Sequence, residues 1–368
     1  MSELDENAPS TGAERTATAL GATPRAVLPP LLASGTEEVF LGAQPAPRLL
    51  RRLRTSSSPY MAAVLVVMFV AFTIAAPGAF NSFGNLRNML MDASSYLVMA
   101  TTMTLVMVAG GFDLSIGSVL VFAGVAAAKV VNLLPFNNFA TVLVGTGVAL
   151  VAGLAWGLFN GLCITKLHIP PLITTLGSLG AALGIADLMT NGNDIASIPS
   201  SLVKVETGSL LGLNWLVWIA AVVVVLGALL LALTRFGRHT YVIGSNAEAA
   251  RRAGINVDRH VLVLYSLSGA TAGLAGMLAL IRFTTTTIGG HGTDALAVIT
   301  GVVLGGTSLY GGIGTVAGTV IGTFIPTVLN NGLTVVNVQP FWQQVSVGFI
   351  LIAAVYVDQL RRRARARA

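Results

Sequence analysis

From about Pro59 to Asp358 the chain is a succession of long hydrophobic segments, interrupted by one strongly basic stretch, the basic island Arg235–Arg259. Apolar runs of this length are stable in few places other than a lipid bilayer. Hydrophobic residues make up 54% of the 368 residues and charged residues only 10%, whereas an average soluble domain has roughly a quarter charged residues. The pattern excludes an ordinary water-soluble core and predicts a polytopic membrane protein.

The predicted fold is all-α, with about ten membrane-spanning helices when apolar runs of about 17–25 residues are read as spans. The predicted spans are 59–80, 88–109, 115–134, 139–164, 171–190, 214–234, 260–281, 294–311, 314–331 and 341–357. They form one membrane domain, 59–358. Residues 1–58 mix Ala, Thr, Ser, Pro and acids without a helical period, which predicts a disordered N-terminal tail.

Basic residues are concentrated in three places, which are Arg48–Arg54, the basic island and the C-terminal tail 359–368. Such clusters next to apolar spans are typical of cytoplasmic flanks under the positive-inside rule. Ten spans that start inside put all three clusters on that side, so both termini and the island are predicted to be cytoplasmic. The clusters flank apolar spans and do not form the footprint of a nucleic-acid-binding surface, so nucleic-acid binding is not expected.

The second half of the basic island predicts a short helix with both ends specified. Asn246 can serve as N-cap, Glu248 lies in the first turn, Arg251 and Arg252 lie in the last, and Gly254 follows as the stop. A helix this short is marginal in water and needs support. It is either a docking helix for a cytoplasmic partner or a membrane-surface helix held by its arginines. Its small alanine face offers little apolar anchorage to lipid, which favours docking.

The segment Gly110–Ser118 lies between two apolar runs and contains Asp113. A carboxylate at membrane depth costs about 2.5–3.5 kcal/mol, so it needs a partner, a wet cavity or a capping role. One interpretation is a discontinuous helix that lines a transport path. The other is a tight cytoplasmic turn in which Asp113 or Ser115 caps the next helix. Residue chemistry leaves both open. Farther along, Asp294 is expected to cap the eighth span.

Several kinds of catalytic site are not indicated by the sequence. It contains no phosphate-binding G-x-x-x-x-G-K-(S/T) loop. The four histidines lack metal-ligand spacing, and Cys163 is the only cysteine, so neither a zinc site nor a disulfide is expected. No Ser/His/Asp or Cys/His arrangement stands out. The chain is therefore not expected to be an enzyme or to hold a cofactor.

Four segments carry a resemblance to a known family. Gly110–Ser118 resembles the GG(I/F)DLS(V/I)GS signature of the ribose/xylose-type permeases of bacterial ATP-binding-cassette importers. Gly244–Asn256 resembles their G-x-N-x-x-A-A-x-x-x-G-I-(N/K) loop. Leu304–Gly312 and Asn330–Leu333 resemble their LGGTSL-x-GG and NNGL stretches. The resemblance runs in order over about residues 60–358, and several motifs in order are more specific than one.

The resemblance implies a type II importer permease in the bacterial inner (plasma) membrane, importing a ribose- or xylose-like monosaccharide by alternating access. A separate cytoplasmic ATPase would bind ATP and Mg and dock on the island, an extracytoplasmic binding protein would deliver the sugar, and a permease homodimer is the simplest assembly. The residues it assigns to ATPase coupling are Gly244, Asn246, Glu248, Ala249, Ala250, Arg251 and Gly254. Those expected at the translocation path or its gate are Gly110, Gly111, Asp113, Ser115, Asp294 and Asn331. Family members often carry Glu before the aspartate that matches Asp294, whereas Thr293 stands here.

Two other classes of protein fit parts of the pattern. An ion-coupled secondary transporter of a small polar solute would explain ten spans and a broken helix. It would normally need more intramembrane acids than Asp92, Asp113 and Asp187. A channel or membrane scaffold would explain the many glycines but not a capped cytoplasmic helix.

Overall fold

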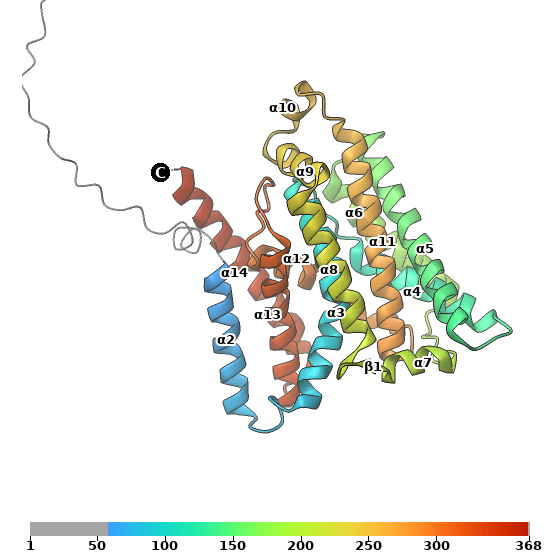
Figure 1. Ribbon diagram of the computed structural model, residues 1–368. Coiled ribbons are helices and arrows are strands. Elements are labelled where there is room, and N and C mark those ends of the chain that lie inside the picture. Colours follow the sequence, from blue (N-terminus) through green and yellow to red (C-terminus); the bar gives the residue numbers. More distant parts are fainter. Residues whose placement is uncertain (1–57, 367–368) are drawn as a thin grey trace, which may run out of the picture. The chain divides into compact units, whose positions relative to one another are not determined.

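The structure, a computed structural model, describes residues 58–366. The predicted tail 1–58 lies outside the described residues except for Ser58, and so do residues 367–368. The helices are α2 (Ser58–Ala75), α3 (Phe83–Val108), α4 (Ile116–Leu133), α5 (Phe139–Thr165), α6 (Pro171–Thr190), α7 (Ser200–Thr207), α8 (Trp215–Leu233), α9 (Arg235–Ser245), α10 (Ala247–Arg252), α11 (Val257–Phe283), the 3₁₀ turn η1 (Ile288–His291), α12 (Asp294–Leu304), α13 (Val316–Val335) and α14 (Pro340–Ala366) (Figure 1). A short antiparallel hairpin, β1 (Ser209–Leu210) and β2 (Leu213–Asn214), precedes α8.

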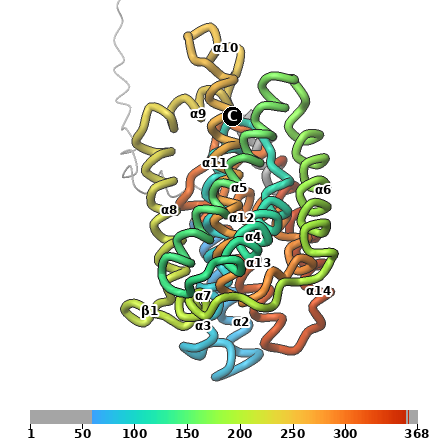
Figure 2. The backbone as a smooth tube through the Cα atoms, turned by 90° about the vertical axis from the view of Figure 1, so that its right-hand side faces the viewer, coloured from blue at the N-terminus to red at the C-terminus, as the bar shows by residue number. Residues whose placement is uncertain are grey.

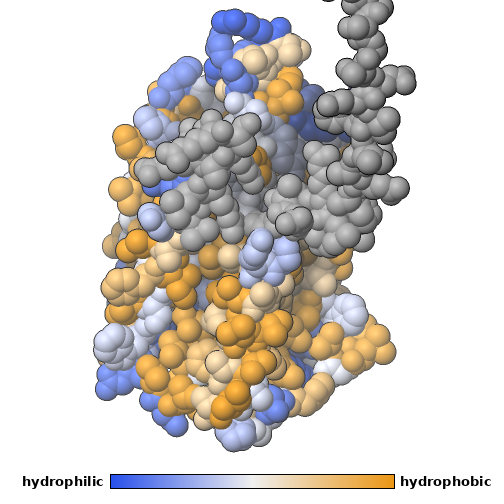
Figure 3. Space-filling model, turned by 90° about the vertical axis from the view of Figure 1, so that its left-hand side faces the viewer, coloured by the Kyte–Doolittle hydropathy of each residue, from blue (hydrophilic) through white to orange (hydrophobic). Residues whose placement is uncertain are grey.

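The burial of the helices is the reverse of that in a water-soluble bundle. Helix α8 contains only apolar side chains, yet just 22% of its most apolar window is buried. Helix α3 contains Asn, Ser and Thr, and 78% of its window is buried. Figure 3 shows hydrophobic side chains over much of one face, with hydrophilic groups above them. Apolar side chains exposed on the outer helices, with Ser and Thr side chains buried among an apolar core, suit a lipid environment. The protein is an all-α polytopic membrane protein, as predicted.

Each predicted span corresponds to an apolar helix, although not all of these helices are long. Seven of the described helices are long and apolar enough to cross a membrane. The remaining three candidates are shorter apolar segments, Pro59–Ala75, Ile288–Leu304 and Pro340–Tyr356. The number of ten crossings therefore stays a prediction. Helix α14 continues beyond its predicted span to Ala366, through most of the predicted basic tail.

The predicted span 294–311 is wrong at its C-terminal end. Helix α12 stops at Leu304, and Gly306 follows with φ +92°. Its 11 residues rise only about 16 Å, about half the thickness of a bilayer core. The chain breaks because two consecutive glycines favour a left-handed turn over another helical turn. Helix α12 begins inside the bundle, where Asp294 is only 4% exposed.

Helices α5 and α11 form the closest packed pair of the bundle. Gly153 and Gly157 on α5 face Gly269 and Gly273 on α11. A Cβ placed on Gly157 would lie 2.9 Å from the Gly269 Cα and would collide with the Tyr265 carbonyl oxygen. The two backbones therefore touch, which is how membrane helices gain packing energy without a hydrophobic driving force. Through this contact α11 is held at the centre of the bundle, against α3, α4 and α5.

The basic island folds into two helices rather than the one predicted. The expected short helix is α10, and the first half of the island forms α9. The Thr234 side chain accepts a hydrogen bond from the Gly237 N–H and caps α9. Both helices lie at one end of the bundle, called here the α10 end, and α7 and the β hairpin lie at the other (Figures 1 and 2).

Candidate functional site

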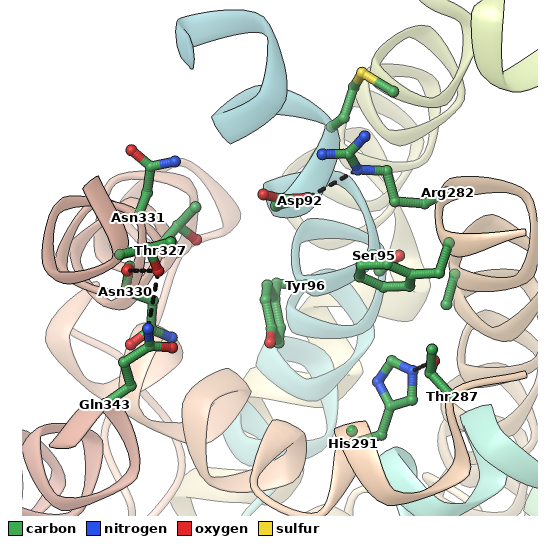
Figure 4. A pocket seen from close by; sticks show the side chains of 15 residues that line it. Asp92, Ser95, Tyr96, Arg282, Thr287, His291, Thr327, Asn330, Asn331 and Gln343 are labelled. Carbon is green, nitrogen blue, oxygen red and sulfur yellow. Dashed lines mark hydrogen bonds and ion pairs between the residues drawn. The ribbon is translucent and has the colours of Figure 1, made fainter. Parts of the chain in front are cut away.

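A pocket with a volume of about 360 Å³ lies between α3, α11, η1, α13 and α14 (Figure 4). The residues that line it come from the first half of α3 and the last parts of α11 and α13. Because α11 starts beside α10, the pocket lies in the half of the bundle away from the α10 end. Its volume is within the range of roughly 300–1,000 Å³ typical of small-molecule sites.

One wall of the pocket carries an ion pair that joins α3 to α11. Arg282 Nε lies 2.9 Å from Asp92 Oδ1, and Arg282 also lies 3.5 Å from a Glu206 carboxylate oxygen. The Arg282 and Asp92 side chains are 19% and 37% exposed. Charged groups inside a membrane protein are costly and are usually paired or in contact with a polar cavity. Asp92 and Arg282 are paired with each other and also line the pocket.

Beside this ion pair, Tyr96 on α3 forms a largely buried network with His291 and Asp294, which lie three residues apart at the start of α12. Tyr96 donates a hydrogen bond to Asp294 Oδ1 at 3.0 Å, and His291 Nδ1 lies 2.6 Å from Asp294 Oδ2. Thr287 contacts the other His291 ring nitrogen. The prediction that Asp294 caps α12 is wrong. Thr293 occupies the N-cap of α12, and its side chain makes no cap bond among the described residues. The Asp294 carboxylate does not cap the helix, because its two oxygens are bonded to Tyr96 and His291.

The opposite wall is made of uncharged amide and hydroxyl groups on α13 and α14. Asn331, predicted at the path, lines the pocket and exchanges two hydrogen bonds with Asn85, at 2.8 and 3.0 Å. Gln343 Nε2 donates to Thr334 Oγ1 at 2.9 Å. The buried Asn330 Oδ1 has no hydrogen-bond partner within residues 58–366. Figure 4 shows this amide wall facing the side that carries Asp92, Tyr96 and His291.

Asp113 lies outside the lining of this pocket, in a separate buried network at the break between α3 and α4. Its Oδ1 accepts from the Ser115 N–H at 3.0 Å and from the Ser115 hydroxyl at 2.6 Å. Its Oδ2 accepts from Ser268 on α11 at 2.7 Å. Asn160 on α5 donates to Ser115 Oγ at 2.8 Å. Asp113 and Ser115 therefore tie the break to α5 and α11, and their role in a transport path stays a prediction.

Three motifs that are far apart in the sequence meet at one place, which we call the glycine junction. It consists of Val108, Gly110, Gly244 and the pair Gly311–Gly312. The Gly312 N–H donates to the Val108 carbonyl at 2.8 Å. A Cβ on Gly311 would lie 2.8 Å from the Gly244 carbonyl oxygen and 3.0 Å from Gly110 Cα. A Cβ on Gly244 would collide with the Val108 carbonyl. The end of α9 is thus packed directly on the end of α3.

Helix α10 has the cap, charge order and stop that the sequence predicts. Asn246 Oδ1 accepts from the Ala249 N–H at 2.9 Å, and Gly254 follows the helix with φ +82°. Ala250 is fully buried against α9 and α11 and supplies the support that so short a helix needs. The residues of the predicted coupling set that face outward from α10 are Glu248, Ala249 and Arg251.

The family model of the branched-chain amino acid transport system / permease component matches residues 85–355. The chain belongs to this family. It is 35% identical to the L-arabinose transport system permease protein AraH of Escherichia coli (strain K12), over 83% of this chain and 91% of that protein. It is 35% identical to the ribose import permease protein RbsC of the same strain, over 82% and 92%. For the galactose/methyl galactoside import permease protein MglC the identity is 34%, over 81% and 93%.

The chain is thus a permease component and not an enzyme, as the sequence predicts. The sequence analysis identified only one of the residues that line the pocket, Asn331, as a site residue. Arg282 and Asp92 are charged residues within largely apolar helices, and that is a usable signal for each residue alone. Their pairing is not visible in the sequence, because 190 positions separate them. The His291–Asp294 spacing of three residues was the other available signal.

Proposed function

We propose that this chain is the membrane subunit of an ATP-driven importer of a monosaccharide in the bacterial inner membrane, with α10 and both termini in the cytoplasm. The observation that carries the proposal is α10 itself. It is capped, supported by its own chain through Ala250, and presents Glu248 and Arg251 outward. The membership of the permease family and the similarity to sugar permeases support it.

The proposed partners follow from this arrangement. A cytoplasmic ATPase, which binds ATP and Mg, docks on the exposed face of α10, and an extracytoplasmic binding protein delivers the sugar to the opposite side. A second copy of the permease completes the assembly. A partner can shift a conformational equilibrium only if it binds the two states differently. The glycine junction supports such coupling, because movement of α9 would act on the end of α3 and on the loop between α12 and α13.

The proposed solute is a pentose or hexose of the ribose or xylose type. The relatives named above are permeases for L-arabinose, ribose and galactose, and a further one, 34% identical over 73% of this chain, is an autoinducer 2 import permease. Uptake that requires ATP in the whole transporter is the expected behaviour. Uptake driven by a proton or sodium gradient instead would support an ion-coupled transporter.

Glu248→Arg tests the docking surface. The Glu248 side chain is 63% exposed and pairs only with Arg252 among the described residues, at 3.5 Å, so the change alters the surface and leaves the fold intact. If α10 is the docking helix, affinity for the ATPase should fall about tenfold or more, as for a residue near the centre of an interface. Co-purification of the ATPase with the tagged permease measures this, and sugar uptake by cells should fall in parallel.

Lys204→Glu is the matched control, because it also reverses an exposed charge but lies on α7 at the opposite end of the bundle. It should leave ATPase binding unchanged. Normal ATPase binding and normal uptake in Glu248→Arg, with wild-type amounts in the membrane, would show that the docking assignment is wrong.

A further inference from the structure

The pocket between α3, α11, η1, α13 and α14 has no part in ATPase docking, yet it is built like a ligand site. We propose that it binds a monosaccharide within a single permease subunit, on the side of the bundle away from the α10 end. The inference rests on the proposed function and goes beyond it by assigning the binding site. Its volume of about 360 Å³ is at the lower end of the range for small-molecule sites, which suits one sugar ring better than a larger solute.

The charges of the pocket favour an uncharged ligand. Asp92 and Arg282 are paired at 2.9 Å, and Glu206 lies 3.5 Å from Arg282 as a second acidic partner. The Asp294 carboxylate is likewise occupied by Tyr96 and His291. A charged solute would have to separate these pairs inside the membrane domain, which is costly. A neutral ligand can instead add hydrogen bonds to groups that keep their partners.

The polar groups of the pocket suit a ligand with many hydroxyl groups. A hydroxyl both donates and accepts, so it can bond to a carboxylate, a guanidinium or an amide alike. The buried Asn330 Oδ1 lacks a partner within residues 58–366. That oxygen is covered from solvent, so a sugar in the pocket would bond instead to the amide and hydroxyl groups that line it, among them those of Asn331, Thr334 and Gln343. Tyr96 and Phe283 add rings, and Met91 adds an apolar side chain, against which the C–H faces of a sugar can pack.

A branched-chain amino acid is the competing occupant, since its carboxylate and ammonium could bind Arg282 and Asp92. The lining argues against it, because the wall opposite the ion pair is formed by Thr327, Asn330, Asn331, Thr334 and Gln343. These amides and hydroxyls would have to lose water next to an aliphatic side chain without replacement bonds. The test therefore includes leucine as a probe.

Protection of an introduced cysteine measures occupancy directly. Ser95 lines the pocket, and Cys163 is the only native cysteine. In a Cys163→Ser background, Ser95→Cys in purified, membrane-reconstituted permease should react with a small polar thiol reagent. At about ten times the dissociation constant, ribose, L-arabinose or galactose should slow this labelling about tenfold, because roughly nine-tenths of the sites are filled. Leucine should not slow it.

Ser209→Cys in the same background is the matched control. It is the same substitution at an exposed position of the β hairpin, outside the pocket lining, so none of the sugars should slow its labelling. Adding Asn330→Ala to Ser95→Cys should reduce the protection to about twofold at the same sugar concentration, because losing one hydrogen bond weakens binding by up to about tenfold. In the complete transporter, Asn330→Ala should raise the KM for sugar uptake while kcat changes little.

The outcomes separate this inference from the proposed function. If the complete transporter imports sugar but no sugar protects Ser95→Cys and Asn330→Ala leaves uptake unchanged, the pocket assignment is overturned and the importer stands. If a sugar protects the cysteine but ATP drives no uptake, the pocket assignment stands and the importer does not. Protection by leucine and by none of the three sugars would overturn the ligand class.

Discussion

Gly157→Val should prevent the membrane domain from assembling, whereas Gly147→Val on the same helix should leave it folded. A Cβ on Gly157 would collide with the Tyr265 carbonyl and lie 2.9 Å from Gly269 Cα and 3.0 Å from the Gly269 nitrogen. Backbone atoms cannot move aside as a flexible side chain can. Helices α5 and α11 would have to separate along their whole contact, so the cost should exceed the about 1–3 kcal/mol of ordinary overpacking.

The comparison with Gly147 removes the effect of helix propensity, since both changes put valine inside α5. A Cβ on Gly147 meets no atom within 4 Å among the described residues. Size-exclusion profiles and thermal unfolding of the detergent-solubilised chain measure the difference. Equal stability of the two variants would contradict the close packing of α5 on α11.

Asp113→Ala should be the most damaging change outside the glycine contacts. It removes an acceptor that is 1% exposed and leaves three donors without their partner, namely the Ser115 N–H and the hydroxyls of Ser115 and Ser268. A buried polar group left unsatisfied costs about 1–3 kcal/mol. With some rearrangement of the hydroxyls, we expect a loss of about 3–5 kcal/mol, measured as the shift in the thermal unfolding midpoint and the yield of folded protein.

Asp113→Asn distinguishes a structural role from a role in transport. The amide keeps an oxygen for Ser115, so it should retain most of the stability lost in Asp113→Ala. If Asp113→Asn is folded but does not take up sugar, the negative charge acts in the transport path. If it is folded and transports normally, Asp113 serves only to hold the break between α3 and α4. Wild-type stability of Asp113→Ala would show that the buried network contributes little.

The predictions that succeeded depend on residues close together in the sequence. Each predicted span matches an apolar helix, and the cap, charges and stop of α10 agree with the pattern from Asn246 to Gly254. Apolar length and capping are local properties, because a membrane helix satisfies its own backbone hydrogen bonds. One of the two errors overlooked a local signal, the glycine pair after α12, and the other arose where the tertiary structure competes with local preference. The Gly305–Gly306 break shortened α12, and two partners took the Asp294 carboxylate away from its expected capping role.

The amino-acid sequence was sufficient for the fold class, the family and the short helix of the basic island, since hydrophobicity, caps and ordered motifs can be read from neighbouring residues. The pocket and the glycine junction depend on the folded protein. Asp92 meets Arg282, Tyr96 meets Asp294, and Gly244 meets Val108 only because close backbone packing brings α3, α9, α11 and α12 together. For the basic island, the structure adds a direct contact with the membrane helices, because Gly244 on α9 packs against Val108 at the end of α3. Long-range contacts of this kind are set by helix packing, which no local pattern specifies.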